Sequence, residues 1–185
     1  MDIIPILASI SLGFFLMATS YRHALIFKSN AQIVMVNLIF AIVSMLMYFL
    51  GYKLGLATIV TLPFNPGIIS IILFLFLAVR MYFSIAKGKL SELIVDLNKF
   101  KTVLTMSLSL SFESFLAALS VSYMFANIYR SILYTIIFIL LFLFIGVYAG
   151  KQTNRLGSIK IFYILSSIFY FINGVICIII TLINM

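Results

Sequence analysis

The segments FLGYKLG (residues 49–55) and FIGVYAG (residues 144–150) repeat one pattern along the chain. Each begins with Phe and contains two glycines in the spacing Gly-x-x-x-Gly, Gly51 with Gly55 and Gly146 with Gly150. Glycines four residues apart lie on one face of a helix, where the missing side chains let a second helix approach closely within a membrane. The repeat therefore predicts two related halves, with the four glycines as helix-packing positions.

The rest of the chain is strongly apolar. Of its 185 residues, 65% are hydrophobic and 9% are charged, and the mean hydropathy is +1.29, far outside the range of soluble globular domains. A helix needs about 20 apolar residues to cross the hydrocarbon core of a bilayer. Such runs occur at residues 3–21, 33–51, 67–86, 102–126, 131–149 and 159–183. The sequence predicts an all-α, polytopic membrane protein of six transmembrane helices.

Three spans per half is an odd number, so the second half should enter the membrane from the opposite side to the first. The prediction is two inverted three-helix repeats, an architecture of many secondary transporters, with residues 1–86 and 102–185 as the repeats. Residues 87–101 alternate apolar and charged positions at helical spacing, which predicts a cytoplasmic amphipathic linker. At an offset of 96 residues, Met17 in the first half falls on Glu113 in the second.

The basic residues gather around alternate loops. Those around the first, third and fifth loops are Arg22, Lys28, Lys87, Lys89, Lys99, Lys101, Lys151, Arg155 and Lys160. By the positive-inside rule these loops are cytoplasmic and both termini are outside, so the net charge of +8 reflects topology and no nucleic-acid partner is expected. The N-terminus has no basic segment typical of a cleaved signal peptide. His23 is interpreted as an incidental residue at the cytoplasmic interface, or as a group that couples protons.

Glu113 is the only charged residue between Lys101 and Arg130. A carboxylate inside a bilayer costs a few kcal/mol, so it normally faces protein, water or an ion. Arg80, the one basic residue in the interior of another predicted span, is its candidate partner. In one interpretation Glu113 binds and releases a proton or cation as the halves move. In the other, Arg80 or nearby serines satisfy it permanently and it serves only to fix helix packing.

The motif Ser111-Phe112-Glu113-Ser114, the paired glycines and an arginine after small residues resemble the MntP-type family of manganese exporters, in the LysE-like transporter superfamily. The resemblance implies that Glu113 takes the place of the family's fourth-span aspartate and is a metal ligand. It also implies that Met17 and Ser44 occupy the positions of two further acids, which makes this chain a divergent member. The residues predicted to line the ion pathway are Glu113, Ser109, Ser44, Arg80, Met17 and Asn173.

Two functions remain open on the sequence. The first is a membrane transporter that exports a small cation such as manganese, located in the bacterial inner membrane. The second is a transport-inactive relative that acts as an accessory or scaffold subunit of a membrane complex, which the missing acids favour. One histidine, one cysteine and four acidic residues supply no catalytic triad and no zinc ligand set, so neither an enzyme nor a cofactor is expected. The expected partners are the lipid bilayer, a small cation or proton, and a membrane protein or second copy.

Overall fold

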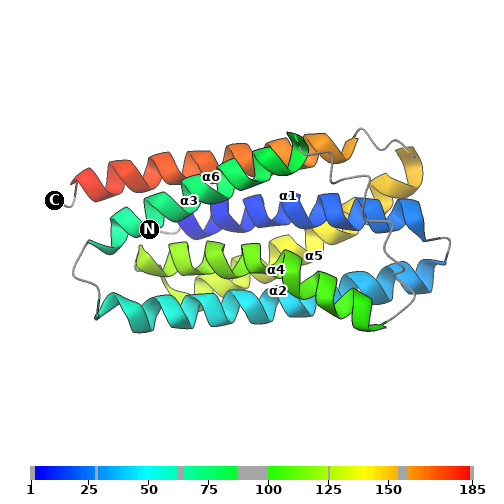
Figure 1. Cartoon of the computed structure of the whole chain (residues 1–185), viewed down its shortest axis with the longest axis horizontal. Helices are drawn as coiled ribbons and strands as arrows, with labels where there is room; N and C mark the ends of the chain where they lie inside the picture. The colour runs from blue at the N-terminus through cyan, green and yellow to red at the C-terminus, as the bar shows by residue number, and fades with distance from the viewer. Residues whose placement is uncertain are drawn as a thin grey trace.

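The computed structural model describes residues 3–27, 29–61, 65–86, 100–124, 126–153 and 158–183. Within these ranges the chain forms six α-helices that run along one common direction (Figure 1). They are α1 (Ile3–Ile26), α2 (Asn30–Ile59), α3 (Pro66–Ala86), α4 (Phe100–Tyr123), α5 (Ile128–Thr153) and α6 (Ser158–Ile183). Each is long and apolar enough to span a membrane, so the predicted six-span, all-α fold is confirmed.

Several helices extend beyond the apolar runs that predicted them. Helix α1 continues to Ile26, which places Arg22 and His23 within it, and α2 continues to Ile59 and encloses both of its paired glycines. Hydropathy marks where the chain is apolar, whereas backbone hydrogen bonding continues into polar sequence until a turn interrupts it. The predicted linker at 87–101 falls mainly on residues 87–99, which lie outside the described ranges, and its last two residues begin α4.

The most extensive helix contacts join the two halves of the chain. Helix α1 packs on α5, α2 packs on α4, and α3 packs on α6. A two-fold axis that exchanges α1 with α4, α2 with α5 and α3 with α6 would convert the first pair into the second and map the third onto itself. The contacts of α1 with α6 and of α4 with α3 are related in the same way. This pairing supports the predicted inverted repeat.

Helix α1 lies at the centre of the bundle (Figure 1). In its most apolar stretch 72% of residues are buried, against 22–39% in the other helices. The other five helices carry many exposed leucine, isoleucine and phenylalanine side chains, as expected of surfaces that contact lipid. The polar side chains of α1 therefore have to find protein partners, and several of them do so on α5.

The paired glycines of α5 lie where that helix crosses α1. A Cβ atom on Gly146 would lie 2.7 Å from the backbone oxygen of Met17, and one on Gly150 would lie 2.7 Å from that of Tyr21. Side-chain carbons do not come so close to carbonyl oxygens, so any larger residue would push the two helices apart.

Helix α2 uses its own glycine pair against α4. A Cβ on Gly51 would collide with the backbone oxygen of Phe115, and one on Gly55 would lie 3.3 Å from the backbone oxygen of Leu119. Both glycine pairs thus allow close helix packing, each against the first helix of the opposite half.

Candidate functional site

Glu113 and Arg80 meet between α4 and α3. The Glu113 side chain is 4% exposed, and its Oε1 atom lies 3.4 Å from Nε of Arg80. A strong charge-assisted hydrogen bond between such groups is shorter, roughly 2.8 Å. The second carboxylate oxygen, Oε2, has no hydrogen-bond partner among the described residues. The structure therefore brings the two predicted partners together in a long, single-point ion pair that leaves one oxygen of the carboxylate unused.

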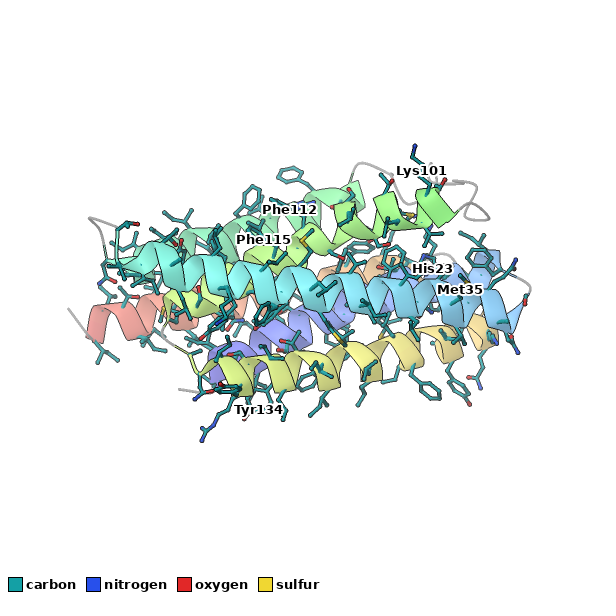
Figure 2. All side chains as sticks on the ribbon, turned by 90° about the horizontal axis from the view of Figure 1, so that it is seen from below. His23, Met35, Lys101, Phe112, Phe115 and Tyr134 are labelled. Atoms are coloured by element: carbon teal, nitrogen blue, oxygen red, sulfur yellow. The ribbon has the colours of Figure 1, made fainter. Side chains whose placement is uncertain are left out.

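Arg80 lies at the edge of this site. Its side chain is 35% exposed, and its guanidinium carbon lies 5.8 Å from the ring centroid of Phe112. The Phe112 ring projects from the surface of α4 (Figure 2), and such a ring attracts a cation over its face. Arg80 therefore contacts the Phe112 ring while it is paired with Glu113.

Helix α6 contributes two phenol groups to the surroundings of Glu113. The Tyr163 and Tyr170 side chains lie close enough to the carboxyl group to interact with its charge. Tyr170 is fully buried, and its hydroxyl has no hydrogen-bond partner among the described residues. The hydroxyl of Ser114, the next residue along α4, is buried and also has no hydrogen-bond partner among the described residues. Because unpaired buried polar atoms are costly, the Oε2 atom of Glu113 and the hydroxyl of Tyr170 are positions where water or an ion would complete the bonding.

Tyr170 was not among the residues predicted from sequence. Tyrosines of membrane helices concentrate at the two interfaces, where the ring is buried and the hydroxyl is wet. Tyr170 instead lies near the middle of α6. Its position in the middle of a predicted span was the sequence signal that could have identified Tyr170 as a site residue, because a phenol at mid-membrane needs a polar partner.

The other predicted pathway residues lie elsewhere. Ser44 is buried between α2 and α4, with its Oγ 3.0 Å from that of Ser111. Asn173 is buried and donates from Nδ2 to the backbone oxygen of Ile4, 3.4 Å away, at the start of α1. Both side chains thus join neighbouring helices.

Ser109 is exposed, whereas Glu113 on the next turn of the same face is buried. The structure therefore separates Ser109 from the buried oxygens of the site. Helical spacing shows which residues share a face, but neighbouring helices decide which part of that face is covered. This explains why the expected polar stripe around Glu113 does not extend to Ser109.

The predicted correspondence of Met17 with Glu113 is off by two residues. The equivalent glycines Gly146 and Gly51 approach the backbone oxygens of Met17 and Phe115 respectively. Met17 therefore corresponds to Phe115, and the α1 counterpart of Glu113 is Phe15. Phe15 is 2% exposed, and its ring packs edge-on against Tyr163 with centroids 5.9 Å apart. A phenylalanine thus occupies the position in α1 that would mirror the carboxylate.

A second polar cluster joins α1, α2 and α5. His23 is fully buried, and its Nδ1 lies 2.8 Å from Oδ1 of Asn37. Asn37 donates from Nδ2 to Ser20 Oγ at 3.0 Å, and Ser20 donates to the backbone oxygen of Leu143 at 2.8 Å. Since the amide oxygen can only accept, His23 carries its proton on Nδ1. His23 lies in the last turn of α1, as predicted near a helix end, but α2 covers it, so its side chain faces protein and not solvent.

We expect Asn37→Leu to lower the free energy of unfolding by about 1 to 2 kcal/mol. The change removes two interhelical hydrogen bonds and leaves the buried Nδ1–H of His23 without an acceptor. The measurement is unfolding of the purified protein in mixed micelles of increasing SDS content. Gln32→Leu, which makes the same kind of change at an exposed position of α2, should leave the midpoint unchanged. Equal stability of Asn37→Leu and wild type would show that the cluster contributes nothing net.

One comparison with known proteins identifies a family for this chain. No curated protein and no solved structure matches the chain. One family model, described as "Putative manganese efflux pump" (MntP), matches residues 28–183. That range covers most of the chain and includes Arg80, Glu113 and all four paired glycines. The protein therefore belongs to the MntP family of membrane transporters.

Proposed function

We propose that this protein exports a small cation across the bacterial inner membrane, with manganese as the first candidate, and that Glu113 is the carboxylate that binds it. The single observation that carries the proposal is the unpaired Oε2 atom of Glu113, whose side chain is 4% exposed within a membrane helix. Intramembrane acids of this kind mark ion pathways in transporters. Membership of the MntP family supports manganese as the cargo.

Arg80 allows Glu113 to alternate between a bound cation and the arginine as its positive partner. When no cation is bound, the arginine partly neutralises Glu113 through the Nε to Oε1 contact. An arriving cation competes for the same carboxylate, and Arg80 moves toward the ring of Phe112 and the exposed surface. Release of the cation lets Arg80 return. In this scheme the carboxylate always has a positive partner, so its burial is tolerated throughout the cycle.

The donor atoms fit a hard cation that keeps part of its water. Manganese prefers oxygen ligands in octahedral sets, and Glu113 and Tyr170 offer a carboxylate oxygen and a phenol oxygen without partners among the described residues. The described residues contain no group of three His, Cys, Asp or Glu side chains that could enclose a metal. A cation here would therefore exchange only part of its hydration shell for protein oxygens, which suits transient passage better than tight storage.

The proposal is tested with the purified wild-type chain in lipid vesicles loaded with manganese. Vesicles that contain the protein should lose manganese faster than protein-free vesicles, as measured by elemental analysis of the external solution. Parallel loads of magnesium, calcium and zinc identify the preferred cargo. If no load of any cation leaves faster than from protein-free vesicles, export is the wrong function, and the accessory role in a membrane complex becomes the better hypothesis.

A further inference from the structure

A groove of about 380 Å³ runs along the outside of the bundle between α2 and α5. Asn37, Ala41 and Leu143 form its buried floor, and the first of these belongs to the His23 cluster. Its walls are more exposed apolar side chains of the two helices, Val34, Leu38, Ile42, Met45, Leu140, Phe144 and Val147. The groove is therefore an apolar furrow that opens on the side of the protein that lipid surrounds.

The groove occupies only one half of the seam between α2 and α5. Toward the opposite end of these helices, the large side chain of Tyr48 on α2 is fully buried. The buried α2 positions of the groove hold the smaller residues Asn37 and Ala41, so the gap there is left unfilled. Along α2 the groove extends from Val34 to Met45, about 16 Å at roughly 1.5 Å per residue. One leaflet of the hydrocarbon core is about 15 Å thick, so the groove matches the reach of a single acyl chain.

A positive charge is fixed at the mouth of the groove. Lys151 lies one turn beyond Val147 on α5, and Asn30 lies one turn before Val34 on α2. The Lys151 ammonium donates a hydrogen bond to the Asn30 side chain, and so bridges the two helices above the groove. Two of the three ammonium protons stay available, because an ammonium group carries three donors. By the charge distribution this end of the bundle faces the cytoplasm, where the leaflet is rich in anionic lipid.

We propose that the groove between α2 and α5 binds one anionic phospholipid, with an acyl chain along the groove and the phosphate at Lys151. A second copy of this chain is a poorer occupant. Two copies related by an axis normal to the membrane would bring both Lys151 side chains to the same depth at one seam, and like charges would repel there. A phospholipid matches both the apolar groove and the charge at its mouth, since its acyl chain fills the groove and its phosphate pairs with Lys151.

The test exploits the absence of tryptophan from the sequence. Leu38→Trp places one fluorescent reporter on the groove wall, where the side chain is 55% exposed and a larger residue has room. Ile168→Trp on α6, 47% exposed and two turns from Lys160, provides a reporter at similar depth outside the groove. Each variant is reconstituted in vesicles of phosphatidylcholine and phosphatidylglycerol, with bromine atoms on the acyl chains of one lipid or the other. Bromine quenches only the tryptophan that it touches, so the ratio of quenching gives the relative affinity of the two lipids.

At Leu38→Trp we expect a preference for phosphatidylglycerol of about tenfold, the value of one charge-assisted hydrogen bond. Lys151→Gln should reduce this ratio to near one, whereas Lys160→Gln should leave it unchanged. At Ile168→Trp the ratio should be near one throughout. Equal ratios at both reporters would overturn the proposal, because they would reflect general attraction to a basic surface. Failure of both lipids to quench Leu38→Trp would also overturn it, and would indicate that protein occupies the groove.

Discussion

Vesicles that contain Glu113→Gln should release manganese at least about tenfold more slowly than vesicles that contain the wild-type chain. Glutamine keeps the size of the side chain and can still accept a hydrogen bond from Arg80, but it offers no charge to a cation. A bond to a charged group contributes about 1.5 to 3 kcal/mol, and 1.4 kcal/mol corresponds to a factor of ten. Because Arg80 is 35% exposed, it is not stranded in the core by the change.

The comparison requires equal amounts of folded protein in the vesicles. Ser109→Ala is the matched control, since it alters a polar residue one turn away on the same helix face, at an exposed position. It should release manganese at the wild-type rate. Should Glu113→Gln also retain the wild-type rate, the ion pair would be a packing element only. The same logic applies to any other cation that the wild type proves to carry.

Gly51→Ala should lower the free energy of unfolding by about 3 kcal/mol or more, the largest stability loss expected from one added methyl group in this protein. The new Cβ would collide with the backbone oxygen of Phe115. A backbone atom cannot turn aside as a side chain can, so α2 and α4 must separate along their seam. Overpacking of a close interface typically costs about 1 to 3 kcal/mol. A clash with a fixed backbone atom should lie at or above the upper end of that range.

The control is another glycine in a helix with a yielding neighbour. A Cβ on Gly174 would come 3.0 Å from Cδ2 of Leu75, the flexible end of a side chain. Gly174→Ala should therefore unfold close to the wild-type midpoint in SDS titrations, while Gly51→Ala unfolds much earlier. If the two variants are equally stable, the close approach at Gly51 does not hold the helices together.

The number of helices and their class were predictable from sequence because each span is a long apolar run with a polar break after it. The pairing of Arg80 with Glu113 was predictable for a related reason, since charged groups in apolar surroundings have few available partners. Helix ends were less predictable. Gly51 and Gly55 mark the end of an apolar run, yet α2 continues to Ile59, because nothing at these glycines interrupts the backbone hydrogen bonds.

The relative register of the two halves could not be read from the sequence. Small and polar residues recur so often in these helices that alignments two residues apart look equally good, and only the contacts of Gly51 and Gly146 select between them. A shift of two residues turns a helix by roughly 200°, which moves a residue to the opposite face. The roles of Tyr170 and His23 were hidden for a different reason, because each depends on helices distant in sequence that cover it.

The central place of α1 has a consequence for how the protein is made. Helix α1 precedes its main neighbours, α5 and α6, in the chain and is therefore synthesised before them, yet it is the most buried of the six described helices. Ser9 and Ser20 bond to α5, and the backbone oxygen of Ser11 accepts a hydrogen bond from Ser166 of α6, so these interhelical bonds form only once the second half is present. Assembly is therefore a late event, in which the second half packs around α1 after α1 has entered the bilayer. We expect a chain truncated before α5 to be degraded by the cell's membrane proteases.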